Sequence, residues 1–236
     1  MQTTCERTIS EIAAAKPSSI RVFESLGIDY CCGGKRSLAD ACTRAGLSLD
    51  RTLALLEEAD AAPTAERDWA DAPLAELVTH IVEAHHSYVR REIPRIDSLL
   101  AKVVNRHGCN HSEVLQIQPL FSALGQELTA HMMKEELVLF PYITRMAAGS
   151  AGFRENCCFG TVANPIANMV AEHEDAGALL VEMRRLSSNY QVPEDGCPTF
   201  RALYQAIEEF ERDLHQHIHL ENNILFPRAI DMERGY

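Results

Sequence analysis

The feature that most constrains this chain is a motif that occurs twice: a histidine four residues before a glutamate, followed by a Leu-Phe-Pro tail. The copies pair His131 with Glu135 in HMMKEELVLFP and His217 with Glu221 in HIHLENNILFP. Four residues span about one turn of an α-helix, so each pair places an imidazole and a carboxylate on one helix face. The motif therefore predicts two helices that carry paired metal-type donors.

Each motif copy belongs to a longer repeat. His86 precedes the first copy and His173 precedes the second, each by about 45 residues, and the two halves are offset by 86 to 87 residues. Each half thus contributes one histidine and then one His-Glu pair. This pattern is typical of a duplicated helical hairpin, which can build a pseudo-two-fold site between its halves.

Four segments show the apolar periodicity of helices, at roughly 73–104, 112–147, 164–190 and 196–231. Turns containing Gly, Cys, Asn or Pro separate them, and the period-two alternation of strands is nearly absent. Four long helices with such turns favour antiparallel neighbours. The sequence predicts an all-α protein with an up-down-up-down four-helix bundle.

The chain is expected to have two domains. Residues 61–72 belong to an Ala/Asp/Pro-rich stretch without an apolar face, which is typical of a linker. We therefore expect a small helical N-terminal domain at 1–60 and the bundle at 73–236.

Composition excludes several function classes. The net charge is −12, with 34 acidic against 22 basic residues, which disfavours nucleic acid and an anionic membrane surface as partners. No long apolar run and no signal-peptide pattern is found, so we expect a cytoplasmic protein. The eight cysteines are then expected to be thiols.

The repeated donors lie on apolar stripes. In the second segment the stripe contains Leu124, Leu128, His131, Glu135, Val138 and Tyr142, at helical spacing. His86, His173, His217 and Glu221 occupy similar positions in the other three segments. Six such donors could satisfy one another by hydrogen bonds, but their duplication makes a metal the more economical explanation. Four imidazoles and two bridging carboxylates in a bundle favour two iron ions, with manganese second, joined by an oxo or hydroxo bridge.

Several polar residues compete for roles at this site. His85 adjoins His86, and periodicity alone does not separate them. His215 and His219 lack the motif's spacing, and His80, His107 and His111 are expected at the surface or in loops. Glu127 and Glu172 are candidates for bonding a ligating histidine, with an exposed helix face as the alternative, whereas Glu136 is expected to be exposed.

An N-terminal turn, Cys31-Cys32-Gly33-Gly34, supplies candidate reactive thiols. The glycines permit a sharp turn that would expose both thiols, and Ser37 can cap the following helix. A helix N-terminus lowers the pKa of a nearby thiol, so the pair could exchange iron, a nitrosyl group or electrons. A buried cysteine beside an exposed spectator is the alternative. Cys157 and Cys158 form a second adjacent pair, to which no role is given.

These motifs carry a resemblance to a known family. LGIDYCCGGKRSLADAC (26–42) resembles an ScdA-type N-terminal domain. HMMKEELVLFP, EHEDAG (172–177) and HIHLENNILFPRA resemble a hemerythrin-like domain. Together they resemble the di-iron repair of iron centres proteins, also called iron–sulfur cluster repair proteins.

The resemblance implies a non-haem di-iron centre with six ligands: His86, His131, Glu135, His173, His217 and Glu221. For the first histidine the match rests on Glu83-x-x-His86, which leaves His85 open. The family also implies that Glu127 and Glu172 line a channel to the metals.

The implied function is repair of iron–sulfur clusters damaged by nitric oxide or oxidative stress, by iron donation, nitric oxide binding or both. The clients would be damaged iron–sulfur proteins. The alternatives are a protein that only binds or buffers nitric oxide or dioxygen, and a di-iron nitric oxide reductase. The electron donor is not specified, and a homodimer remains open.

Overall fold

The computed structural model describes residues 5–31, 34–61, 67–149 and 159–235. The described residues form helices and no strand, apart from one isolated bridge between Thr8 and Ser37. The all-α prediction is therefore confirmed. Cys32, Cys157 and Cys158 lie outside the described residues.

The described part of the N-terminal region contains the short helices α2 (Ile9–Ala15), α3 (Ser18–Leu26), α4 (Leu38–Ala45) and α5 (Leu49–Ala61). Local sequence sets their ends. Thr8 and Glu11 form a capping box at α2, and Ser37 caps α4 by accepting the Asp40 backbone N–H, as predicted. Gly46 ends α4 in a left-handed conformation with φ of 67°, which glycine adopts without a Cβ clash.

The described residues from 67 onwards contain four long helical segments. A π-helical turn interrupts the first, second and fourth of them. They are α6 (Leu74–His80), η1 (Ile81–His86) and α7 (Ser87–His107); α8 (Ser112–Lys134), η2 (Glu135–Leu139) and α9 (Phe140–Ala147); α10 (Ala163–Leu186); and α11 (Pro198–His219), η3 (Leu220–Leu225) and α12 (Phe226–Arg234). The η elements are short π-helical turns. The predicted segment 112–147 agrees with α8 through α9, but the third segment ends at Leu186 rather than at residue 190. There the Tyr190 N–H bonds the Ser187 hydroxyl, and residues 188–190 take positive φ.

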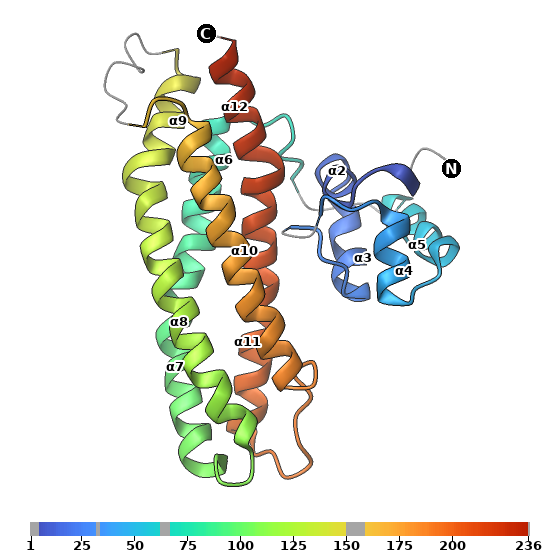
Figure 1. The fold of residues 1–236 in the computed structure, drawn as a ribbon, viewed down its shortest axis with the longest axis vertical. Coiled ribbons are helices and arrows are strands. Elements are labelled where there is room, and N and C mark those ends of the chain that lie inside the picture. Colours follow the sequence, from blue (N-terminus) through green and yellow to red (C-terminus); the bar gives the residue numbers. More distant parts are fainter. Residues whose placement is uncertain (1–4, 32–33, 62–66, 150–158, 236) are drawn as a thin grey trace. The chain divides into compact units, whose positions relative to one another are not determined.

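Contacts divide the described chain into two compact units, Met1–Leu77 with His215–Tyr236, and Val78–Leu214. In the second unit α7, α8, α10 and α11 run side by side as a bundle (Figure 1). Arg184 on α10 pairs with the buried Glu211 on α11, and the rings of Phe121 and Phe210 meet edge to face at 5.4 Å. The predicted boundaries at 60 and 73 stay a prediction, although a bundle preceded by a helical region is confirmed.

The Leu-Phe-Pro tails explain two of the π-helical turns. Pro141 and Pro227 stand at the start of α9 and α12, directly after η2 and η3. Proline lacks the N–H that would bond the preceding turn, and its ring clashes with the carbonyl four residues earlier, so the helix widens there. The widened turn also corrects the apolar stripe predicted for the second segment. The Val138 side chain is 45% exposed, and Leu139 occupies the buried position instead.

No helix in the described part of the chain is both long enough and apolar enough to cross a membrane.

Truncation of a core aromatic should destabilise the bundle. Phe121 is fully buried, so Phe121→Ala is expected to lower the free energy of unfolding by about 3–5 kcal/mol through lost burial and a residual cavity. Leu115→Ala, on the same helix at 48% exposure, is the matched control and should change it by less than about 0.5 kcal/mol. Chemical denaturation measures both. Equal effects would mean that Phe121 does not belong to the stabilising core.

Candidate metal centre

Six side chains that ordinarily seek water are almost completely buried. None of them is more than 2% exposed. They are the predicted ligands His86, His131, Glu135, His173, His217 and Glu221. Their burial requires compensation, because an isolated charge in a protein interior costs several kcal/mol or more.

Within the second unit, three of the imidazoles lie close together beside Glu135. Its Oε2 lies 3.4 Å from His86 Nε2 and 3.3 Å from His131 Nε2. The Nε2 of His173 lies 3.0 Å from the Nε2 of His131. Three imidazoles from three different helical segments thus present the same ring nitrogen to one small volume.

The second motif copy has a similar internal geometry. On the continuous helix α11–η3, His217 Nε2 lies 3.0 Å from Glu221 Oε1. The corresponding pair in the first copy, His131 and Glu135, is separated by 3.3 Å. Each copy therefore positions its imidazole and carboxylate through the turn of one helix, as the spacing predicts.

Two groups of four donors, among the described residues, could each hold a metal ion. One contains His86, His217 and both glutamates, Glu135 and Glu221; the other contains His131, His173 and the same two glutamates. Each group has two imidazoles of its own and shares both carboxylates. Shared carboxylates are what two adjacent ions need as bridges, and nitrogen and oxygen donors suit first-row metals, so the residues fit a di-iron centre.

Two acids outside this cluster fix the imidazoles. Glu136 Oε1 accepts a hydrogen bond from His86 Nδ1–H at 2.6 Å, and Glu172 Oε2 accepts one from His131 Nδ1–H at 2.9 Å. With Nδ1 protonated, Nε2 keeps its lone pair for a metal. Burial raises the pKa of both carboxyls, but hydrogen bonds from His86 and Arg90 leave that of Glu136 below its usual value. Hydrogen bonds from Lys134 and His131 likewise leave the pKa of the Glu172 carboxyl below its usual value.

Glu136 corrects the sequence analysis, which expected an exposed acid. Its side chain is only 25% exposed and joins His86 to Arg90. The π-helical turn η2 begins at Glu135 and turns the next residue towards α7, a change that helical periodicity does not reveal. Glu127 is exposed on α8, and its assignment to a channel stays a prediction.

The competing histidines have other partners. His85 is buried like His86, but its Nδ1 lies 3.0 Å from Asp213 Oδ1. His219 is also buried; it accepts a hydrogen bond from the Asn223 amide at 2.8 Å, and burial lowers its pKa to about 4. His107 ends α7 and His111 lies in the loop before α8; both are half-buried, and their rings lie 6.0 Å apart.

Family models cover most of the chain. The model of the Hemerythrin HHE cation binding domain matches residues 77–229, and that of ScdA_N, a domain of unknown function (DUF542), matches residues 5–60. The chain belongs to the hemerythrin HHE family. The hemerythrin HHE domain binds two iron ions, in agreement with the donor set described above.

Relatives match over almost their whole length. Three are named iron-sulfur cluster repair protein YtfE. The protein from Pectobacterium atrosepticum is 38% identical over 229 residues, and that from Edwardsiella ictaluri is 40% identical over 229 residues; each match covers 95% of this chain and 97% of the relative. The protein from Escherichia coli O81 is 37% identical over 225 residues, with the same coverage. The family resemblance inferred from the sequence is confirmed.

Tyr30, which precedes the N-terminal thiol turn, contacts the helix that carries the second motif copy, within the first unit. The ring of Tyr30 lies 5.5 Å from that of His219, and the Asn223 amide donates to the Tyr30 carbonyl at 3.0 Å. The next residue, Cys31, is buried, contrary to the expectation of an exposed thiol. Its backbone N–H donates to Asp29 Oδ1 at 3.0 Å, which holds the start of the turn.

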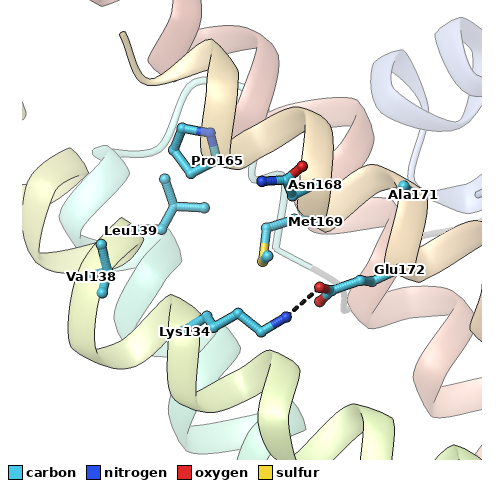
Figure 2. Close-up of a pocket in the computed structure, with 8 residues that line it drawn as sticks. All are labelled: Lys134, Val138, Leu139, Pro165, Asn168, Met169, Ala171 and Glu172. Carbon is cyan, nitrogen blue, oxygen red and sulfur yellow. Dashed lines mark hydrogen bonds and ion pairs between the residues drawn. The ribbon is translucent and has the colours of Figure 1, made fainter. Parts of the chain in front are cut away.

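A pocket lies beside the hemerythrin HHE donors in the second unit. It has a volume of about 380 Å³ and lies between α8, η2 and α10. Figure 2 shows the ion pair of Lys134 and Glu172 at one side and the side chains of Leu139 and Met169 at the other. Because Glu172 also bonds His131, the pocket extends from solvent to the partner of a candidate ligand.

Loss of an acid that bonds a candidate histidine ligand should weaken iron retention. Glu136→Gln removes the carboxylate that accepts the His86 proton, and is expected to speed iron loss to a chelator by about 10- to 100-fold. Glu208→Gln, an exposed acid on α11, is the matched control and should leave the rate unchanged. The measurement is iron release followed by absorbance in the presence of a strong chelator. Equal rates in all three proteins would remove Glu136 from the centre.

Proposed function

We propose that this chain repairs iron–sulfur clusters damaged by nitric oxide or oxidative stress, by donating iron to damaged iron–sulfur proteins. The observation that carries the proposal is the match over 95% of the chain to relatives named as iron–sulfur cluster repair proteins. Both the thiol turn and the repeated His-Glu motif lie within that match. Its site of action would be the cytoplasm.

The six proposed iron ligands are His86, His131, Glu135, His173, His217 and Glu221. The support is that each donor group has two imidazoles and shares the same two carboxylates. His86 is favoured over His85 because its Nε2 lies 3.4 Å from Glu135, whereas His85 Nδ1 lies 3.0 Å from Asp213.

Bound iron supplies the centre with Lewis acidity and redox capacity, and one of its ions is also the cargo in this proposal. The protein residues control how firmly that cargo is held. Imidazole binds a metal only when Nε2 is unprotonated, so proton delivery at Nε2 releases the ligand. The Glu172 carboxylate, 34% exposed, accepts the Nδ1–H of His131 and so keeps Nε2 available to the metal, and loss of this bond would weaken that ligand.

The thiol turn is the proposed site of exchange with a client. Cys31 adjoins Tyr30, which packs on the helix that carries Glu221 in the first unit. Soft thiolate donors can accept iron from a site built of nitrogen and oxygen ligands. We assign this role to Cys31 and Cys32 together.

A second candidate function is binding and buffering of nitric oxide or dioxygen without repair. The pocket beside Glu172 favours it, because Val138, Leu139 and Met169 give it an apolar lining suited to a small neutral molecule. The two functions differ in what happens to the iron, which a buffering protein keeps.

Iron transfer distinguishes them. Iron-loaded protein, mixed anaerobically with a cluster-free ferredoxin-type acceptor, sulfide and thiol, should restore the acceptor's visible absorbance while losing its own iron. Retention of all iron, with no cluster formed, would contradict repair. Release of nitrous oxide over many turnovers with nitric oxide and a reductant would instead indicate a reductase.

The same iron-transfer assay tests the proposed role of the thiol turn. Cys31→Ala with Cys32→Ala should load iron normally but transfer it at least about tenfold more slowly. Cys109→Ala, an exposed cysteine of the bundle, should transfer iron at the normal rate. A normal rate in the double variant would remove the cysteines from the mechanism and leave the iron site untouched.

Removal of a shared carboxylate should disrupt the ion pair. Glu135→Ala or Glu221→Ala is expected to lower bound iron from two ions per chain to one or fewer, because each carboxylate belongs to both donor groups. Glu127→Ala is the exposed control. Metal analysis and Mössbauer spectra give iron content and magnetic coupling. Two coupled ions in both variants would contradict the bridging assignment.

A further inference from the structure

A second cluster of metal-type donors lies at the other end of the bundle. His107 ends α7 and His111 immediately precedes α8, while Asp195 and Cys197 lie just before α11. The loops that carry them meet at the end of the bundle where α7 passes to α8 and α10 to α11 (Figure 1). The 21 residues of α7 span about 30 Å, so this cluster is remote from His86 at the other end of the same helix.

The donor atoms of this cluster converge. One ligand atom each from His107, His111 and Asp195 lie within 4.8 Å of one another. His111 Nε2 lies 3.0 Å from Asp195 Oδ1, and His107 Nε2 lies 3.2 Å from Cys197 Sγ. Two imidazoles and a carboxylate from two loops thus form one group of three donors, and the Cys197 thiol lies beside His107.

Both imidazoles are held in place. The buried ring of Phe200 meets the ring of His107 at 5.5 Å and that of His111 at 5.3 Å, in both cases edge to face. Glu113 Oε1 accepts a hydrogen bond from His111 Nδ1–H at 2.9 Å. This bond leaves Nε2 for another partner, which is the arrangement that a carboxylate imposes on a metal-binding histidine.

The distances suit a tetrahedral ion. With metal–ligand bonds of about 2.0–2.3 Å, neighbouring donors on zinc lie roughly 3.3–3.6 Å apart. The two donor pairs at 3.0 and 3.2 Å would need to open by only about 0.3–0.4 Å. Cys197 precedes the first turn of α11, where the backbone N–H groups of Phe200 and Thr199 lower its pKa, and a thiolate is the ligand form of cysteine.

We infer that His107, His111, Asp195 and Cys197 form a second metal site, which binds Zn²⁺. His107, His111 and Asp195 form the converging donor group, and Cys197, 3.2 Å from His107, would supply the fourth ligand. Zinc accepts such a set of two nitrogens, one oxygen and one sulfur, whereas the buried iron donors include no sulfur. A bound ion would fasten the α7–α8 loop to the α10–α11 loop. The site does not depend on the repair proposal, because none of its residues belongs to the six iron ligands.

Cobalt is the probe, because Co²⁺ replaces Zn²⁺ and reports its ligands by absorbance. Titration of the full-length, iron-loaded protein should show one additional Co²⁺ per chain, with intense visible bands of tetrahedral cobalt and a near-ultraviolet cobalt–thiolate band. One equivalent of Zn²⁺ should displace it. Absence of tightly bound cobalt beyond the iron, or an octahedral spectrum, would overturn the site.

Matched variants identify the ligands. Cys197→Ser should lose the cobalt–thiolate band, and His107→Gln with His111→Gln should abolish stoichiometric binding. Cys109→Ser, an exposed cysteine in the same loop as the histidines, should keep the full spectrum. Normal iron content and helical circular dichroism verify folding in each variant. A thiolate band that follows Cys109, or that is absent from the unmodified protein, would overturn the proposed ligand set.

Discussion

The structure depends on the neutralisation of two carboxylates deep in a helical bundle. Glu135 and Glu221 are both fully buried among four buried imidazoles. Two anions so placed would repel one another and pay a large desolvation cost unless protons or cations compensate them. Two iron ions held by these carboxylates would convert that repulsion into attraction. In the proposed site the fold would supply the donors, and the ions would make the burial of these donors tolerable.

The same proline that ends each motif helps to shape the site. Pro141 and Pro227 remove a backbone hydrogen bond just beyond each glutamate, and a π-helical turn precedes each proline. A π-helical turn admits one extra residue, so it changes which side chains face inward after the glutamate. In the first copy this change brings Leu139 into the core and lets Glu136 reach His86. The repeated sequence motif thus folds into the same local geometry in both copies, a π-helical turn followed by a proline.

The features that could be predicted from the sequence are those that depend on the spacing of residues along one helix. The pairs His131–Glu135 and His217–Glu221 follow from one helical turn, and the helical segments follow from apolar periodicity. Contacts between segments far apart in the chain could not be predicted in this way. The bond from His86 to Glu136 joins residues 50 positions apart, and the bond from His111 to Asp195 joins residues 84 apart. Their partners depend on how helices pack, which no spacing along one helix encodes.

In the bundle, the candidate metal ligands and the aromatic residues that stabilise the core lie at different positions along the helix axes. At the iron end, α8 and η2 place polar donors in the interior, which reduces the apolar area that packing can bury. Away from that end the interior is aromatic: Phe121 meets Phe210, and Phe200 meets Tyr204 at 4.9 Å. Burial of such rings dominates core energetics. A zinc ion beside Phe200 would add a fixed crosslink at this apolar end, so that iron could leave the other end without unfolding the bundle.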